Sequence, residues 1–135
     1  MSQENVEFVR SGLEAFNRGE WSQVFERWFD PAIEWSDPPG FPGAGVHKGR
    51  AAVEARFNDL AEMLEGFSVQ PEAFFDAGDD VVCFVRTGGR GRSSGIDVSR
   101  PVAWVLTVKE GRVVKVVGYE DHDAALAAAG LDPSG

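Results

Sequence analysis

The sequence is poor in the residues that bind metals or form disulfides. It has one cysteine and two histidines, and these three residues lie far apart in the chain. No disulfide can form within the chain, and no ligand spacing suggests a zinc or iron site. The single thiol, Cys83, stands in the apolar run VVCFV, where a small buried side chain is the usual interpretation. We therefore expect neither a metal nor another cofactor.

Positive charge is also scarce. The chain has 13 Lys and Arg against 22 Asp and Glu, which gives a formal net charge of −9. This charge repels phosphate backbones and anionic lipid headgroups, so we expect neither nucleic acid nor a membrane surface as a partner. The GRGR stretch is interpreted as a solvated hairpin loop. No basic and apolar leader opens the sequence, and no apolar run reaches about eighteen residues, so we expect a cytoplasmic protein.

Aromatic residues, in contrast, are abundant. With 135 residues the chain can build one core, and we expect a single domain over residues 1–130 followed by a tail at 131–135. Hydrophobic residues make up 43% of the chain and include ten Phe and four Trp. This exceeds the aromatic volume that a minimal core needs, and spare aromatic side chains often line a pocket.

Three helices are predicted in the first half. Apolar residues recur at helical spacing between Ser2 and Gly19, over 21–29 and over 48–65. The three apolar faces are Val6, Val9, Leu13 and Phe16, then Trp21, Val24, Phe25, Trp28 and Phe29, then Val53, Phe57, Leu60 and Leu64. A short strand is predicted at 32–36. The stretch DPPGFPGAG that follows it is too rich in Pro and Gly for regular structure.

After Gly66 the apolar period changes from helical to alternating, and turn residues recur at short intervals. We predict four strands at 67–76, 81–88, 98–108 and 113–120, joined by short links as an antiparallel meander. A last helix is predicted at 121–129, with Asp121 as its N-cap. Helices followed by a meander indicate an α+β fold in which the N-terminal helices pack on one face of a curved antiparallel sheet. Such an arrangement forms a cone with an open mouth.

The register of the last two strands predicts which side chains share a face. A two-residue turn at Glu110 and Gly111 pairs Lys109 with Arg112. Counting back from this turn sets Trp104 opposite Val117 and Val102 opposite Tyr119. The predicted shared face comprises Val102, Trp104, Leu106, Val117 and Tyr119.

Asp37 is the most informative polar residue. It ends an apolar-alternating stretch and is followed at once by two prolines, in EWSDPPG. One interpretation is an acidic turn residue that accepts local backbone N–H groups. The other is a carboxylate held still at the mouth of the cone, where burial beside Trp35 would disfavour its charged form and strengthen it as a base. The second interpretation treats Asp37 as a carboxylate without a cationic partner.

Several segments together resemble one family. They are MSQENVEFVRSGLEAFNRGE, AIEWSDPPG, HKGRAAVEARFNDL, AGDDVV and WVLTVKEGRVVKVVGYEDHDAAL, and in this order they resemble the SnoaL-like group of the NTF2-like superfamily. The resemblance implies the NTF2-like cone. It does not imply one activity, because the superfamily includes isomerases, polyketide cyclases, epoxide hydrolases, dehydratases and proteins without catalytic activity.

Ketosteroid isomerase, a relative in that superfamily, bears on Asp37. By this resemblance Asp37 stands where that enzyme has its general base. The two oxyanion donors of that enzyme fall here at Gly12 and at Ala103 or Trp104, so steroid isomerisation itself is not expected.

From these observations we predict a pocket for a small, largely apolar organic molecule. If the protein is an enzyme, Asp37 is the general base that removes a proton next to a carbonyl. The residues expected to contact the ligand are Trp35, Trp104, Tyr119, Phe16, Phe57 and Val117. A homodimer through the sheet is expected, because the strands at 81–86 and 113–117 are apolar on both faces. The alternatives are a non-catalytic binding protein and a structural dimerisation domain whose cone is filled by side chains.

Overall fold

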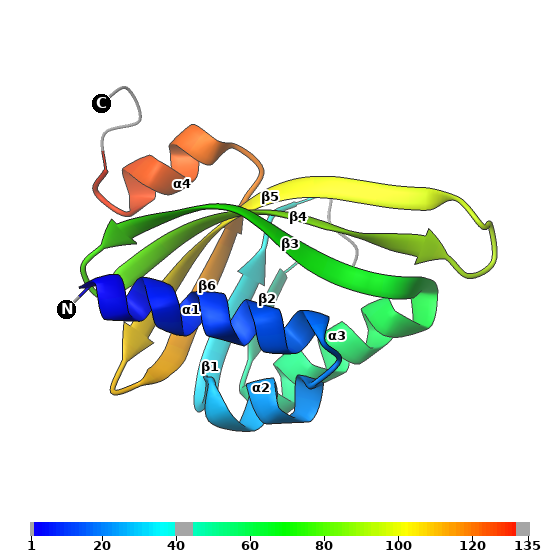
Figure 1. Ribbon diagram of the computed structural model, residues 1–135, viewed down its shortest axis with the longest axis horizontal. Coiled ribbons are helices and arrows are strands. Elements are labelled where there is room, and N and C mark those ends of the chain that lie inside the picture. The colour runs from blue at the N-terminus through cyan, green and yellow to red at the C-terminus, as the bar shows by residue number, and fades with distance from the viewer. Residues whose placement is uncertain (1, 40–44, 132–135) are drawn as a thin grey trace.

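The computed structural model describes residues 2–39 and 45–131. These residues form four helices packed on a six-stranded curved sheet that does not close into a barrel (Figure 1), so the predicted α+β fold is confirmed. The helices are α1 (Ser2–Asn17), α2 (Trp21–Arg27), α3 (Arg50–Met63) and α4 (His122–Ala128). The strands are β1 (Phe29–Asp37), β2 (Gly45–Lys48), β3 (Leu64–Ala77), β4 (Asp80–Gly91), β5 (Asp97–Lys109) and β6 (Arg112–Tyr119).

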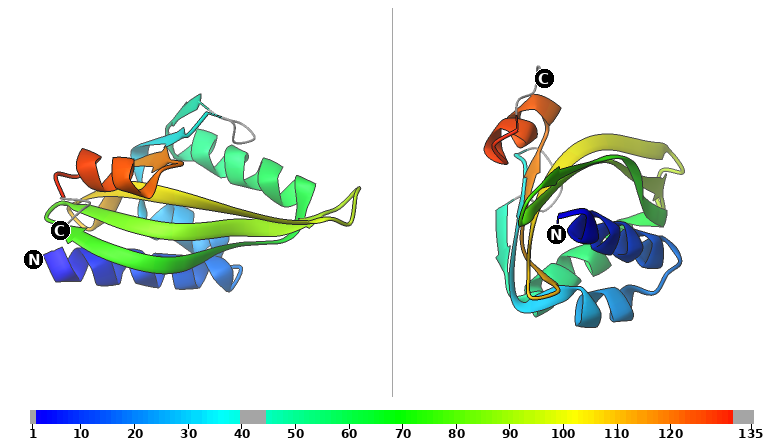
Figure 2. Two further views of the ribbon diagram at one scale, coloured as in Figure 1. Left: turned by 90° about the horizontal axis from the view of Figure 1, so that it is seen from above. Right: turned by 60° about the vertical axis from the view of Figure 1, so that its left-hand side comes forward.

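The three N-terminal helices lie where their apolar faces can be buried. The sheet curves around α1, and α2 and α3 close the same concave side (Figure 2). Val6, Val9 and Phe16 of α1 are buried, as are Val53, Phe57 and Leu60 of α3. The helical spacing read from the sequence therefore identified the core-facing residues. Within the described residues, no helix combines the length and the apolar character needed to cross a membrane.

The sheet has the strand order β2-β1-β6-β5-β4-β3, in which β3 to β6 form the predicted antiparallel meander. Several features differ from the prediction. Gly89 to Gly91 of the GRGR stretch, predicted to be a loop, belong to β4, where Gly89 pairs with Val98 and Arg90 with Asp97. Strand β1 pairs with β6 in parallel, so the sheet is mixed. Strand β2, which pairs with the end of β1, begins at Gly45 inside the stretch predicted to be irregular. Residues 40–44 of that stretch, and residues 132–135 of the predicted tail, lie outside the described residues.

The predicted register of β5 and β6 is wrong by one residue. The turn is as expected, since Lys109 pairs with Arg112 and Val108 with Val113. A β-bulge then shifts the ladder, so that Thr107 pairs with Lys115 and Trp104 with Gly118. A shift of one residue moves every later side chain to the other face. Tyr119 therefore pairs with Ala103, and Val117 with Val105, on the face opposite to Trp104.

This opposite, convex face carries a second, smaller core beneath α4. Val82, Ala103, Val105 and Ala125 are buried there, with Tyr119 packed against them. Helix α4 starts as predicted, because the Asp121 side chain accepts a hydrogen bond of 3.1 Å from the Asp123 backbone N–H. Helices α1 to α3 therefore cover the concave face of the sheet, and α4 lies on the convex face (Figure 2).

Candidate functional site

Asp37 is the last residue of β1, and its side chain continues the inward-facing series of that strand. Ile33, Trp35 and Asp37 alternate along β1 and are 0%, 2% and 8% exposed. Residues two apart on a strand share a face, so the register that buries the two apolar side chains also buries the carboxylate. The interpretation of Asp37 as an exposed turn residue is therefore wrong.

The carboxylate has a cationic partner that the sequence analysis missed. Arg56 of α3 donates from Nε to Asp37 Oδ2 and from Nη2 to Asp37 Oδ1, the second bond measuring 2.6 Å. The indole Nε1 of Trp35 donates to Asp37 Oδ1 at 3.0 Å. The side chains of Asp37 and Arg56 are 1% and 6% exposed. A two-bonded guanidinium–carboxylate pair is well suited to compensate both buried charges, so the unpartnered carboxylate expected from the sequence is a paired one.

A signal for Arg56 was present in the sequence. It lies three residues after Val53 and four before Leu60, on the buried stripe of α3. A charged residue at a core position is expensive unless it is paired, so its place in the stripe indicated a buried partner. The guanidinium also lies over two aromatic rings, 5.0 Å from the Phe57 centroid and 5.6 Å from the Trp35 centroid.

His47 brings a second titratable side chain to the pair. It is paired with Trp35 in the β1–β2 register. Its Nε2 lies 3.9 Å from Asp37 Oδ2, and its side chain is 25% exposed. The imidazole therefore lies between the buried carboxylate and solvent. No group of three or more His, Cys, Asp or Glu side chains in the described part of the chain could hold a metal ion.

The pair opens onto a hollow of about 330 Å³ between α3 and the long β4–β5 hairpin. Its charged and polar lining residues are Asp37, Arg56, Thr87 and Arg100, and its apolar lining includes Phe57, Leu60, Leu64, Phe67, Val98 and Trp104. Further inside the cone the space is nearly filled. The cavity there measures about 50 Å³ and is lined by aromatic and aliphatic side chains.

Of the six residues predicted to contact a ligand, the structure brings four together. Ring centroids are 5.1 Å apart for Trp35 and Trp104, 5.1 Å for Trp35 and Phe57, and 5.2 Å for Phe16 and Phe57. Phe57 and Trp104 line the hollow at Asp37, whereas Phe16 and Trp35 line the small inner cavity. The other two, Val117 and Tyr119, lie on the convex side of the sheet because of the bulge.

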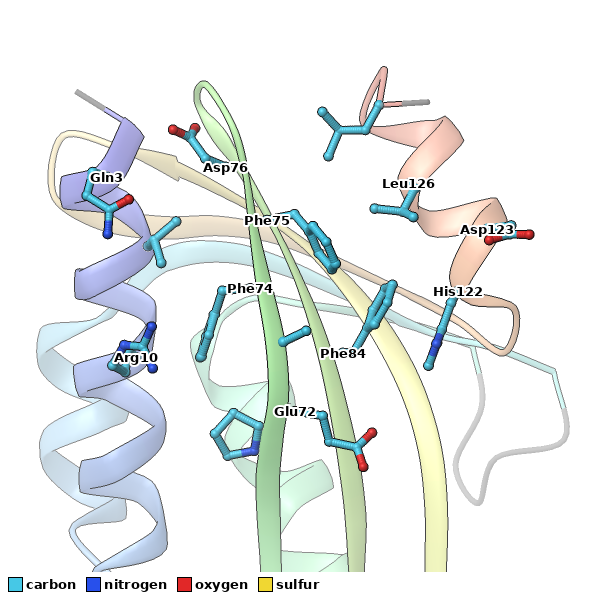
Figure 3. A pocket seen from close by; sticks show the side chains of 14 residues that line it. Gln3, Arg10, Glu72, Phe74, Phe75, Asp76, Phe84, His122, Asp123 and Leu126 are labelled. Atoms are coloured by element: carbon cyan, nitrogen blue, oxygen red, sulfur yellow. The ribbon is translucent and has the colours of Figure 1, made fainter. Parts of the chain in front are cut away.

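A wider and more open hollow lies outside the cone, between α1, β3 and α4 (Figure 3). It straddles the edge strand β3, with Phe74 beside Arg10 of α1 and with Phe75 and Phe84 toward α4. The His122 ring stacks on Phe84 at 3.8 Å. The charged residues that line it are all exposed, in contrast to the buried pair at Asp37. We therefore take the hollow at Asp37 as the candidate site.

The curved sheet around α1 to α3 defines an NTF2-like protein. The chain belongs to the SnoaL-like domain family, which it matches over residues 9–116. No match was found among curated proteins.

Solved structures agree with this assignment. An NTF2-like protein from Burkholderia xenovorans LB400 is 31% identical, with 96% of this chain and 97% of that chain covered and a TM-score of 0.73. An NTF2-like protein from Burkholderia thailandensis E264 is 30% identical, with 92% and 95% covered and a TM-score of 0.76. Bal32a, from a soil-derived mobile gene cassette, is 28% identical, with 87% and 89% covered and a TM-score of 0.78.

Proposed function

We propose that this SnoaL-like protein binds a small, largely apolar organic molecule in the hollow beneath the β4–β5 hairpin. The observation that carries the proposal is the buried Asp37–Arg56 pair at one end of an otherwise mostly apolar lining. Ligand sites are commonly apolar hollows of at least about 300 Å³ with a few fixed polar groups. The volume of about 330 Å³ lies at the lower end of that range.

Because the inner part of the cone is nearly filled, a ligand position at the mouth is favoured over a position deep in the interior. The inner cavity of about 50 Å³ holds little more than a water molecule. Phe57 and Trp104 would form the wall between the ligand and the inner aromatic cluster. The polar end of the ligand would face Arg56, and its apolar body would lie against Leu60, Leu64 and Phe67.

Calorimetric titration with two probes of one shape, 2-naphthylmethanol and naphthalene-2-carboxylate, tests this proposal. We expect at least one of them to bind. Val98→Trp should abolish the binding, because Val98 lines the hollow and a tryptophan there would fill it. Ile96→Trp is the matched control: it adds the same side chain to the same hairpin at a 65% exposed position outside the lining. Failure of both probes, or equal loss in both variants, would refute the proposal.

A second candidate function is proton transfer by Asp37 next to a carbonyl group. His47, 3.9 Å from Asp37 Oδ2 and partly exposed, favours it by offering a route for the proton to solvent. Arg56 would then act as a hydrogen-bond donor to the developing oxyanion. Both oxygens of the Asp37 carboxylate already accept hydrogen bonds from this guanidinium, so proton abstraction would compete with the pair. The resting geometry therefore supports binding more directly than it supports this chemistry.

Deuterium exchange tests the second candidate. The α-protons of 2-tetralone in D₂O can be followed by proton NMR with and without protein. If Asp37 is the base, the protein accelerates exchange and Asp37→Asn abolishes the acceleration, while circular dichroism shows that the variant is folded. An acceleration that Asp37→Asn retains would remove Asp37 from the role.

A further inference from the structure

The β4–β5 hairpin is the basic part of an acidic protein. Residues 86–100 contain four arginines, Arg86, Arg90, Arg92 and Arg100, against the single acid Asp97, a net charge of +3. The whole chain carries −9, so the remaining residues carry −12. A local charge of the opposite sign attracts ligands that the rest of the surface repels.

This hairpin also covers the candidate site. It projects beyond the body of the molecule above the end of α3 (Figure 1). Thr87, Gly88, Val98 and Arg100 of the hairpin line the hollow at Asp37. The hairpin is fixed to α3, because Arg92 donates from Nε to the Ala61 carbonyl at 3.1 Å and from its backbone N–H to the Met63 carbonyl at 3.0 Å. The basic hairpin therefore lies over the hollow and also contributes residues to its lining.

The charges inside the hollow do not cancel. Among the described residues that line it, Asp37 is the one acidic residue, against the two guanidinium groups of Arg56 and Arg100. Both oxygens of Asp37 already accept bonds from Arg56, and Oδ1 accepts a third from Trp35. Arg56 uses Nε and Nη2 for this pair, and within residues 2–39 and 45–131 its Nη1 has no hydrogen-bond partner. Arg100 adds a further positive charge, so the described residues of the lining carry a net +1.

From these observations we infer that the ligand of the site is an organic anion: a compact apolar ring system that bears one carboxylate or enolate oxygen group. This inference rests on the proposed function and narrows it. The anionic group faces Nη1 of Arg56 and the guanidinium of Arg100, and the ring system lies against Phe57, Leu60 and Trp104. Guanidinium groups match the geometry of a carboxylate, and such charge-assisted hydrogen bonds are stronger than those between neutral groups.

The test compares the two naphthalene probes by calorimetry. They share a ring system and differ in one group, a carboxylate or a neutral alcohol. We expect the carboxylate to bind at least about tenfold more tightly, the effect of one hydrogen bond to a charged group. Added sodium chloride should weaken binding of the carboxylate and leave binding of the alcohol nearly unchanged.

Two arginine variants test which guanidinium group causes the preference for the carboxylate probe. Arg100→Gln should remove most of the preference for the carboxylate, since Arg100 lines the hollow. Arg90→Gln is the matched control: it removes the same charge from the same hairpin at a residue outside the lining, and it should keep the preference. Equal binding of the two probes would overturn the inference and leave the proposed function standing. Equal loss of the preference in both variants would also overturn it, because the charge then acts from the hairpin surface and not inside the hollow. Binding of neither probe would overturn the proposed function as well.

Discussion

Arg56 of α3 and Asp37 at the end of β1 are joined by two hydrogen bonds inside the molecule, although 19 positions separate them in the chain. The pair connects the helix to the strand at the mouth of the cone. It also changes the chemistry of the mouth, because the carboxylate oxygens already accept hydrogen bonds from a guanidinium, which holds the carboxylate in place as a polar anchor.

The pair determines how stability should respond to the substitution Asp37→Asn. A buried carboxylate without a partner would destabilise the folded protein, and Asp37→Asn would then stabilise it. With Arg56 in place, the same substitution leaves a buried guanidinium without its counter-charge. We expect Asp37→Asn to lower the free energy of unfolding by about 3–5 kcal/mol, measured by urea denaturation at neutral pH.

The double variant Asp37→Asn with Arg56→Gln is the control for that experiment. Because the second substitution removes the uncompensated charge, it should recover part of the loss, and the two effects should be far from additive. A stabilised Asp37→Asn variant would mean that the two side chains are not paired in solution.

The sequence predicted most of the fold because its signals were local. The stripes of α1 and α3, the turn at Glu110 and Gly111 and the cap at Asp121 each depend on residues close together in the chain. The parallel pairing of β1 with β6 does not, and no short-range pattern indicated it. The bulge between β5 and β6 was hidden because VVKVV is apolar on both faces, so either register buries valines.

Of the two paired residues at the candidate site, only Asp37 was predicted, because only Asp37 is marked by residues close to it in the chain. Asp37 stood out through its prolines, and its burial follows from the alternation of β1. Its partner depends on how α3 packs against β1, which is a tertiary contact. Arg56 is the detectable half of that contact, because it is a charged residue on an apolar stripe; the apolar residues alone define the helix and do not indicate the partner.

Gly118 offers a test of packing behind the site. A Cβ built there would lie 2.9 Å from Pro38 Cδ, 3.3 Å from the Ser36 carbonyl oxygen and 3.5 Å from Trp104 Cδ1. We expect Gly118→Ala to lower the free energy of unfolding by about 1–3 kcal/mol, since neither the proline ring nor the backbone can give way easily.

Gly12→Ala is the control for Gly118. A Cβ at Gly12 would also make a tight contact, 3.1 Å from Trp28 Cδ1, but against a partly buried side chain. Alanine also favours the helix by about 1 kcal/mol, so the net change should be small. Equal losses in the two variants would contradict the special constraint at Gly118.

The homodimer remains a prediction. Helix α4 has seven residues and covers part of the convex face, and Val117 of β6 stays partly exposed there. Light scattering should therefore give twice the chain mass of 14.6 kDa. Val117→Arg should shift the mass toward that of one chain without unfolding the protein. A single-chain mass for the unmodified protein would refute the dimer.

Cys83 predicts a pH dependence of stability. Burial raises the pKa of its thiol far above the ordinary value, and the positive charge of Arg10 opposes this shift. In the unfolded chain the thiol ionises near pH 8.5. Between these two values the folded state keeps a proton that the unfolded state has lost, so folding is less favourable there. Stability should fall as pH rises above about 8.5, by about 1.4 kcal/mol at one pH unit beyond the unfolded value.

Urea denaturation of wild type and Cys83→Ala over about pH 7.5 to 9.5 measures this effect. Alanine leaves a small cavity that lowers stability at every pH, so the comparison is between the slopes and not between the absolute values. The variant should lose the part of the decline that belongs to the thiol, while lysine and tyrosine contribute equally to both proteins. The folded wild-type protein should also react with a thiol reagent far more slowly than the protein in urea, because the thiolate is the reactive form. Identical slopes together with rapid labelling of the folded protein would show that Cys83 is accessible to solvent and that its thiol ionises as freely as in the unfolded chain.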